Sequence, residues 1–274
     1  MRVAITVDGR IIIEQGGSQF DASALARKIK PVWPAEPGDP FMQIWADIRA
    51  LTDDEIAALP PISVDGSKLR NPIRSPNKIL GAMANYTAAD GAIPETSIRK
   101  YGFFVKANSA ITSPTEGVVV PADMPTLHEP ELSLIIGRTI RFASHDEARE
   151  AIAAVCGSLD MTGKSSHLFS HRKSLDSFAV FDSWLTPIDE FSAPEDLHDL
   201  GIKLWINEDL RQDGSTNRLI WKPIDLVVEA SRYFTLYPGD IIMCGTPSGV
   251  GPVEPGDQIR VEIERTAGFS VPVR

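Results

Sequence analysis

The chain has 274 residues, an ordinary globular composition and a formal net charge of −10. No basic cluster stands out, which argues against a nucleic-acid partner, and no apolar run is long enough to span a bilayer. This length suits one large domain, or a main domain with a small appendage.

The first fifteen residues do not have the layout of a signal peptide, because Asp8, Arg10 and Glu14 interrupt their apolar positions. Two cysteines, Cys156 and Cys244, lie in apolar segments and are predicted to be buried thiols in a reducing compartment. We therefore expect a soluble cytoplasmic protein with no membrane partner.

Residues 1–71 are predicted to form a small N-terminal subdomain, followed by a main domain over residues 72–274. The stretch "RVAITVDGRIIIEQ" predicts a β-hairpin that turns at Asp8 and Gly9. A short helix is expected in "DDEIAALPPISVDG", where prolines then interrupt the chain.

Two convincing helices are predicted beyond residue 75, among many short apolar runs separated by Gly and Pro. The first is "SHDEAREAIAAV", residues 144–155, with Ser144 as N-cap and Glu147 completing a capping box. The second is roughly "PIDLVVEASRYFT", residues 223–235, and the C-terminal "DQIRVEIERTAGFSVPV" alternates as strands. The pattern indicates a mostly β fold with few helices, in the α+β class.

Two glutamates open the apolar strand in "HEPELSLIIG", and strand alternation places Glu129 and Glu131 side by side on one face. Asp160, in "CGSLDMTGK", follows a second apolar strand and could complete a three-carboxylate site. Hard oxygen ligands of this kind suit Mg²⁺, Mn²⁺ or Ca²⁺. Spacing alone leaves a second interpretation open, in which the glutamates are solvated charges at a strand edge and Asp160 caps a turn.

Several sequence blocks, in one order and at sensible intervals, resemble the fumarylacetoacetate hydrolase family over roughly residues 72–265. They are "NPIRSPNKILGAMANY", "GFFVKANSAI", "HEPELSLIIGRTI", "CGSLDMTGK", "RKSLDSFAVFDSWL", "WINEDLRQDGST" and "GDIIMCGTPSGVGPVEPGDQIRVEI". The resemblance implies a distorted β-roll, usually a homodimer, in which Glu129, Glu131 and Asp160 hold Mg²⁺ or Mn²⁺. Family members cleave carbon–carbon bonds, decarboxylate, or isomerise small 2-oxo acids and their enols.

The same resemblance implies roles for further residues. Lys173, in "RKSLDSF", matches the family's active-site lysine, and Lys106, in "FVKAN", matches a lysine near the pocket. Thr246, in "CGTPSG", matches a threonine that hydrogen-bonds the substrate carboxylate, and Gly245 beside it would let the backbone approach the ligand. Without these blocks, a lone lysine is more simply interpreted as a solvated surface group.

The sequence departs from the family pattern in two places. Many members carry N-Y-x-x-H-x-x-E, a histidine–glutamate pair in a lid, whereas this chain has Ala89 and Ala92 there. The block usually written D-x-T-x-R-D-x-Q has Lys164, Ser165 and His167 in place of the arginine, aspartate and glutamine. The metal site is thus kept, while the acid–base groups and the substrate clamp are changed.

A substitute proton carrier is therefore needed if the chain activates water. His167 and His171 lie in sequence between Asp160 and Lys173, and we expect His167 to take over part of this role. The alternative is that both histidines are exposed loop residues. Further and weaker candidates are Asp90 and Glu95, whereas His128, beside Glu129, could support that metal ligand.

Three functions remain open from the sequence. The first is a divalent-metal-dependent hydrolase that cleaves a carbon–carbon bond in a small 2-oxo acid, such as an acylpyruvate or a fumarylacetoacetate-like compound. The second is a decarboxylase or enol–keto isomerase of a 2-oxo acid, which needs no hydrolytic water. The third is a metal-binding family member with little catalysis.

Overall fold

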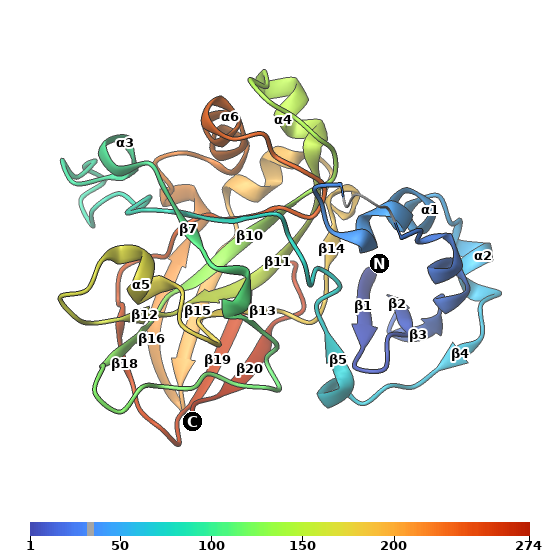
Figure 1. The fold of residues 1–274 in the computed structure, drawn as a ribbon, viewed down its shortest axis with the longest axis horizontal. Coiled ribbons are helices and arrows are strands. Elements are labelled where there is room, and N and C mark those ends of the chain that lie inside the picture. Colours follow the sequence, from blue (N-terminus) through green and yellow to red (C-terminus); the bar gives the residue numbers. More distant parts are fainter. Residues whose placement is uncertain (32–35) are drawn as a thin grey trace.

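The computed structural model describes residues 1–31 and 36–274. Figure 1 shows a smaller N-terminal part beside a larger part that contains most of the strands. The N-terminal part is built on one five-stranded sheet in the order β4-β3-β2-β1-β5. Its strands are β1 (Arg2–Thr6), β2 (Ile11–Gln15), β3 (Ser18–Asp21), β4 (Pro61–Ile62) and β5 (Leu69–Arg70).

The predicted N-terminal hairpin is present. Strands β1 and β2 pair antiparallel, with Ile5 opposite Ile11, and the Thr6 amide donates to the Arg10 carbonyl at 2.9 Å. Gly9 in the turn has φ +86°, a left-handed conformation that glycine adopts without steric cost.

The larger part contains an eight-stranded mixed sheet in the order β7-β6-β17-β10-β11-β13-β8, with β14 paired to β11. Its strands are β6 (Ile79–Ala82), β7 (Phe103–Lys106), β8 (Ile111–Thr112), β10 (Pro130–Ile136), β11 (Ile152–Asp160), β13 (Ala179–Phe181), β14 (Thr186–Pro187) and β17 (Ile241–Met243). The antiparallel pair of β10 and β11 lies at its centre, and these two strands are buried at every position.

Two smaller sheets complete this part. A four-stranded sheet, in the order β16-β15-β19-β20, consists of β15 (Gly201–Ile206), β16 (Asp209–Ser215), β19 (Gln258–Ile263) and β20 (Phe269–Pro272). A three-stranded sheet, in the order β12-β9-β18, consists of β9 (Thr126–His128), β12 (Thr162–Gly163) and β18 (Gly251–Val253). Leu132 and Leu134 of β10 share one buried apolar core with Leu204 of β15 and Val261 of β19, so the sheets enclose a common interior.

Helices are few and short, as expected from the sequence. They are α1 (Trp45–Arg49), α2 (Asp53–Ala57), α3 (Ile98–Tyr101), α4 (His145–Ala151), α5 (Phe169–Lys173) and α6 (Pro223–Tyr233). The 3₁₀ turns are η1 (Ser23–Lys28), η2 (Pro40–Ile44), η3 (Gly66–Lys68), η4 (Asn108–Ala110), η5 (Ile188–Glu190), η6 (Pro194–His198) and η7 (Thr216–Arg218). The mostly β, α+β class predicted above is confirmed.

One helix prediction was too long. Helix α4 begins at the Ser144 capping box as predicted but ends at Ala151, and residues 152–155 form the start of β11. Ile152 and Val155 are β-branched and completely or almost completely buried, so pairing with β10 in the sheet centre overrides the helical pattern.

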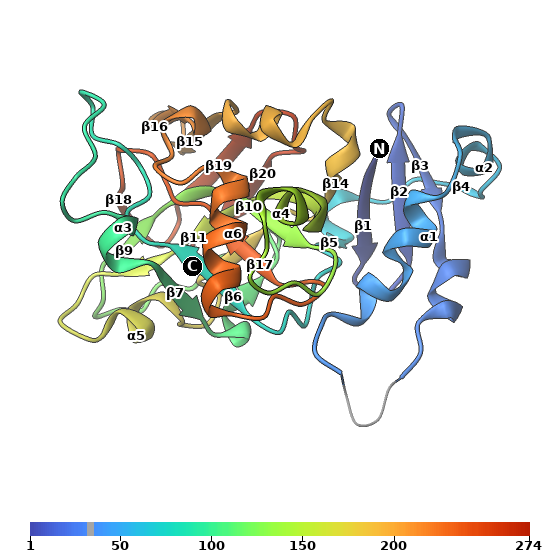
Figure 2. The ribbon, with the colours of Figure 1, turned by 90° about the horizontal axis from the view of Figure 1, so that it is seen from above.

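The N-terminal sheet packs against the larger part, as Figure 2 shows from above. Ile13 and Ile48 share one buried cluster with Ile135 of β10, Phe181 of β13 and Met243 of β17. The five-stranded sheet thus covers apolar surface that the eight-stranded sheet would otherwise expose to water. The division into residues 1–71 and 72–274 stays a prediction.

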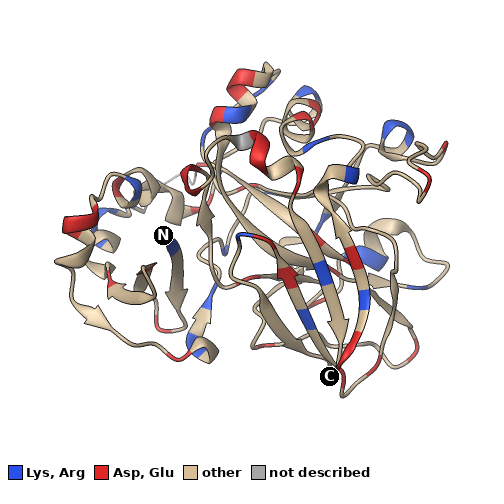
Figure 3. Cartoon of the chain, turned by 180° about the vertical axis from the view of Figure 1, so that it is seen from behind, with Lys and Arg blue, Asp and Glu red and all other residues tan. Residues whose placement is uncertain are grey.

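Charged residues of both signs are spread over the described part of the chain. Figure 3 shows Lys and Arg interspersed with Asp and Glu along the ribbon. Among residues 1–31 and 36–274, no helix is long and apolar enough to cross a membrane. Cys156 and Cys244 are both buried free thiols.

Candidate metal and substrate site

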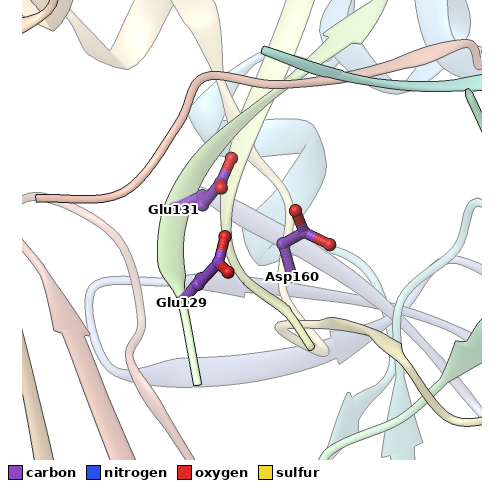
Figure 4. A group of neighbouring side chains, drawn as sticks. All are labelled: Glu129, Glu131 and Asp160. Atoms are coloured by element: carbon purple, nitrogen blue, oxygen red, sulfur yellow. The ribbon is translucent and has the colours of Figure 1, made fainter. Parts of the chain in front are cut away.

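Three carboxylates meet where β10 and β11 lie side by side. Glu131 is in β10, Asp160 ends β11, and Glu129 lies just before β10. The Asp160 amide donates to the Glu129 carbonyl at 2.9 Å, which fixes the two strand ends together. One ligand oxygen from each carboxylate lies within 4.8 Å of the others, and Figure 4 shows all three side chains converging.

The strand itself directs the glutamates. Leu132 and Leu134 are fully buried in the common interior, and successive side chains alternate between faces. The side chain of Glu131 therefore points to the opposite face, as the sequence pattern predicted. Its exposure is only 2%, whereas the Glu129 side chain keeps 17% of its surface open to solvent.

Two buried lysines neutralise much of this charge. Lys173, at the end of α5, donates to Glu129 Oε2 at 2.8 Å and to Asp160 Oδ2 at 2.5 Å. Lys106, at the end of β7, donates to Asp160 Oδ1 at 2.5 Å and to the Met161 carbonyl at 3.4 Å. Both oxygens of Asp160 are therefore engaged by ammonium groups.

Aromatic rings hold Lys173 in place. Its Nζ lies 5.1 Å from the centroid of Phe104 and 5.6 Å from that of Phe169, and the two rings pack edge to face. Gly81 of β6 makes room for Phe104, because a Cβ at this position would overlap the ring. The end of α5 and the neighbouring strand β7 thus position the ammonium together.

Burial and charge shift the pKa values of these groups in different directions. Burial lowers the pKa of Lys106, although Asp160 opposes this. Burial alone would lower the pKa of Lys173, but the three carboxylates outweigh this effect and raise the pKa above its ordinary value. Burial, together with the neighbouring Asp160, raises the pKa of Glu131 well above its ordinary value.

This oxygen-only cluster fits a hard divalent cation. Within the described residues it is the group of His, Cys, Asp and Glu side chains close enough to hold a metal ion. Carboxylate oxygens suit Mg²⁺ and Mn²⁺. Three carboxylates and two ammonium groups carry a formal charge of −1, so a divalent cation would leave the site at +1, which favours an anionic ligand.

The loop after β17 borders the carboxylates and carries the predicted substrate groups. The Gly245 amide donates to Glu131 Oε2 at 2.6 Å, and Gly245 has φ +101°, which favours glycine. Thr246 follows it and is half-buried, with its Oγ1 accepting a hydrogen bond from Gln212 at 3.0 Å. The structure thus brings Gly245, Lys106 and Lys173 into direct contact with the triad, and Thr246 is the residue after Gly245.

The altered lid segment is exposed to solvent. Ala89 and Ala92 are exposed, and Asp90 accepts a hydrogen bond from the Ala92 amide at 2.9 Å within its own turn. Glu95 is 93% exposed and lies 4.0 Å from Lys100. Among the described residues, no hydrogen bond or ion pair joins either acid to the three carboxylates.

The histidines named from the sequence fall into two groups. His167 and His171 are exposed, with ring centroids 4.6 Å apart, and in the described part of the chain no hydrogen bond or ion pair joins either ring to the three carboxylates. His128 is fully buried beside Glu129, and its Nδ1 lies 2.7 Å from Gln212 Oε1. Burial lowers the pKa of His128.

Sequence reasoning missed three polar residues that border the site. Thr162 donates to Glu129 Oε1 at 2.7 Å, and Gln212 joins His128 to Thr246. The Tyr86 hydroxyl is buried and has no hydrogen-bond partner among the described residues, and burial raises its pKa. Each lies in a block already noted for its resemblance, but spacing alone does not reveal contacts made across the fold.

The fold and the carboxylate site together define a member of the fumarylacetoacetate hydrolase family, and the chain belongs to this family. The family model described as fumarylacetoacetate (FAA) hydrolase C-terminal matches residues 78–274. The resemblance predicted from the sequence is confirmed, as is the expectation of an enzyme from a metal-dependent hydrolase family.

Among relatives, a maleylpyruvate hydrolase from Aquipseudomonas alcaligenes is 34% identical over 288 residues, covering 100% of this chain and 99% of that protein. An oxaloacetate tautomerase from Escherichia coli strain K12 is 31% identical over 182 residues, covering 63% of this chain and 80% of that protein.

Among solved structures, a maleylpyruvate hydrolase from Sphingobium sp. SYK-6, in complex with manganese(II) and pyruvate, superposes with a TM-score of 0.85. It is 33% identical, and the match covers 100% of this chain and 98% of that chain. The similarity therefore extends over the N-terminal sheet as well as the larger part.

Proposed function

We propose that this protein is a divalent-metal-dependent hydrolase that cleaves a carbon–carbon bond in a small acylpyruvate, with maleylpyruvate as the first candidate substrate. The observation that carries the proposal is the largely buried triad of Glu129, Glu131 and Asp160, which is contacted by two lysines and by the Gly245 amide next to Thr246. The full-length similarity to two maleylpyruvate hydrolases supports the choice of substrate class.

Each residue has a distinct part in this proposal. A divalent cation on the triad, Mg²⁺ or Mn²⁺, would supply Lewis-acid stabilisation of negative charge on a bound oxo acid. Lys173 has three N–H donors, two of which hold Glu129 and Asp160, so one remains for a substrate oxygen. Thr246 is proposed to donate to the substrate carboxylate.

Lys106 has a different proposed part from the one that its sequence block suggested. Its ammonium is completely buried, and it contacts Asp160 and the Met161 carbonyl. We propose that it orients Asp160 and adds positive charge to the site. Its contribution to substrate binding would then be electrostatic.

Hydrolysis of an acylpyruvate adds the oxygen of water to the acyl carbonyl carbon. The bond between that carbon and the methylene of the pyruvate portion breaks, and the electron pair leaves as the enolate of pyruvate. A proton that originates from the water is added to the former methylene carbon of the enolate, so the products are pyruvate and a carboxylic acid. The protein must therefore move one proton from water to carbon.

His167 is proposed to carry part of this proton transfer. Its position on the exposed segment before α5, four residues from His171, supports this role. The exposed ring would have to approach the substrate when the site binds it, since catalytic hydrogen bonds often form only in the substrate complex.

A second candidate function is enol–keto isomerisation of a 2-oxo acid. Isomerisation moves a proton between carbon and oxygen and needs no hydrolytic water. It therefore tolerates Ala89 and Ala92 at the lid positions better than hydrolysis does. The similarity to an oxaloacetate tautomerase supports this alternative. Decarboxylation shares the same advantage.

The test is incubation of the purified protein with Mn²⁺ or Mg²⁺ and a panel of maleylpyruvate, fumarylpyruvate, acetylpyruvate and oxaloacetate. Hydrolysis gives pyruvate and an acid in equal amounts, decarboxylation gives CO₂, and isomerisation changes the enol absorbance with no new acid. Production of pyruvate and maleate supports the main proposal. Binding without turnover would overturn it and would indicate a ligand-binding member with little catalysis.

A homodimer in the cytoplasm is also proposed. Family resemblance supports the dimer, and the two buried free thiols, Cys156 and Cys244, support a reducing compartment. Light scattering coupled to size-exclusion chromatography tests the first part, with a mass of twice 29.9 kDa expected.

A further inference from the structure

Gln212 lies at the centre of a buried chain of hydrogen bonds next to the proposed substrate site. It is the buried residue in the middle of strand β16, whose other residues are exposed or half-buried, and its own exposure is 1%. Its Oε1 lies 2.7 Å from His128 Nδ1, and its Nε2 lies 2.7 Å from the Pro247 carbonyl and 3.0 Å from Thr246 Oγ1. Three separate segments of the chain meet at this one amide.

The chemistry of the partners fixes the direction of every bond. The Pro247 carbonyl can only accept, so the atom facing it must be the NH₂ group of Gln212. The amide oxygen then faces His128 Nδ1, which must donate, and both the neutral Nδ1–H tautomer and the protonated ring can do so. The second amide hydrogen goes to Thr246 Oγ1.

These hydrogen bonds determine the role of the Thr246 hydroxyl. Because its oxygen accepts from Gln212, its own hydrogen is free to point elsewhere. Thr246 is half-buried and directly follows Gly245, whose amide binds Glu131 of the triad. The Thr246 hydroxyl thus lies one residue from a direct backbone contact with the triad.

Close packing keeps the loop on β16. A Cβ at Gly249 would overlap the Arg211 carbonyl, and one at Gly214 would overlap the Pro247 ring. Gly251 pairs with His128 where β18 joins β9. Loop 245–251 thus lies directly against the strands that hold Gln212 and His128.

We propose that Gln212 is a positioning residue, held by His128, that makes the Thr246 hydroxyl a dedicated hydrogen-bond donor to the carboxylate of a 2-oxo acid. This inference rests on the proposed function, in which Thr246 binds that carboxylate. It assigns to Gln212 a role in substrate affinity that needs no contact with the substrate.

Replacement by glutamate tests the direction of the bonds. Gln212→Glu keeps the shape and can still accept from His128, but its second oxygen can only accept. The Thr246 hydroxyl would then donate to the introduced carboxylate instead of to the ligand. Since a hydrogen bond to a charged group contributes about 1.5–3 kcal/mol, pyruvate should bind the Mn²⁺-loaded variant roughly 10- to 100-fold more weakly, measured by calorimetry.

The added charge of this variant is separated from the hydrogen bond by a double-mutant cycle with Thr246→Val. In the Thr246→Val background, the new carboxylate still repels pyruvate. The loss of the hydrogen-bond donor has no further effect there, because the hydroxyl is already absent. We expect Gln212→Glu to weaken pyruvate binding much less in the Thr246→Val background than in the wild type. Thr246→Ser, which keeps the donor, should retain the full effect of Gln212→Glu.

His128→Phe provides a second, uncharged variant should Gln212→Glu fold poorly. It removes the donor to Gln212 Oε1, so the amide is held by the Pro247 carbonyl and Thr246 alone. Pyruvate affinity should therefore fall several-fold, and this loss should again vanish with Thr246→Val. In both variants Mn²⁺ should still bind, and KM for the acylpyruvate should rise more than kcat falls.

Equal losses with and without the Thr246 hydroxyl would overturn the inference. If the wild type turns over an acylpyruvate while Gln212→Glu binds pyruvate normally, the inference fails and the proposed function stands. If the wild type neither binds pyruvate nor acts on any acylpyruvate, both fail.

Discussion

Lys106 donates to one oxygen of Asp160 at 2.5 Å, and both side chains are almost completely removed from solvent. Lys173 takes the other oxygen of the same carboxylate. Asp160 is thus both a proposed metal ligand and the common partner of two buried cations. This arrangement links the stability of the fold to the charge of the site.

Lys106→Met should destabilise the metal-free protein, by about 3–5 kcal/mol, because it leaves a buried carboxylate without one of its counter-charges. Saturating Mn²⁺ should recover part of that loss by supplying positive charge at Asp160. Chemical denaturation with and without Mn²⁺ measures both effects. Lys78→Met, which breaks the distant ion pair with Asp240, is the matched control, and its loss should not depend on the metal.

Glu131→Gln should remove the stabilisation of the fold by divalent cations. The amide keeps the size of the side chain and can still accept from Gly245, so the fold should survive. A ligand at 100 times its Kd stabilises the native state by about 2.7 kcal/mol, and this increment should disappear. Thermal unfolding with Mn²⁺ or Mg²⁺ measures it, with the exposed Glu254→Gln as control. Unchanged metal affinity in Glu131→Gln would refute the assignment of this ligand.

Lys173→Met should weaken the binding of oxalate, a compact dicarboxylate mimic of an enolpyruvate, by tenfold or more while metal binding persists. The reason is the loss of the remaining ammonium N–H that is proposed to meet the ligand. Turnover of an acylpyruvate should fall in parallel. Calorimetry with oxalate and Mn²⁺ provides the measurement, and wild-type affinity in the variant would leave Lys173 with a structural role only.

His167→Gln should lower turnover by roughly 100-fold if His167 transfers a proton, which is the typical contribution of general acid–base catalysis. The pH dependence of turnover should also change, with the metal kept saturating. His171→Gln is the control, since its ring packs against His167 but is not proposed to act on substrate. Wild-type turnover with an unchanged profile would show that the proton moves by another route.

Asp182→Asn should make the protein more stable above neutral pH than the wild type. Burial raises the pKa of Asp182 to about 7 from an ordinary value of 3.8, and one of its oxygens has no partner among the described residues. The folded state therefore binds the proton more tightly than the unfolded state. The stabilisation that protonated Asp182 gives the folded state is complete below about pH 4 and is lost as pH rises to about 7.

The free energies of unfolding of wild type and Asp182→Asn should consequently diverge between about pH 4 and 7 and stay apart above that. The gap should reach a few kcal/mol, because each pH unit between the unfolded and folded pKa values adds about 1.4 kcal/mol. Urea denaturation across pH 4–8 measures this gap, and the exposed Asp209→Asn should show none. A constant difference across the range would contradict the buried, proton-binding state of Asp182.

Much of the site could be predicted from local patterns. The spacing of Glu129 and Glu131 before an apolar run places both carboxylates at one strand end, and the structure brings Asp160 beside them. The capping box at Ser144 marked the start of α4 correctly, because capping depends on residues within one turn. The end of that helix was missed, since the conformation of Ile152 and Val155 depends on pairing with the neighbouring strand β10 and not on the residues beside them in the chain.

The family follows from the resemblance of several sequence blocks, and the mostly β class and the chemical type of the three carboxylates follow from residue identity and short-range periodicity. The packing of the folded chain was needed to show that Lys106 is a buried partner of Asp160, 54 positions away, and that Gln212 joins His128 to Thr246 across 84 and 34 positions. Such contacts have no local signature. They form when strands distant in the chain pack together, and burial then makes each polar group depend on one specific partner.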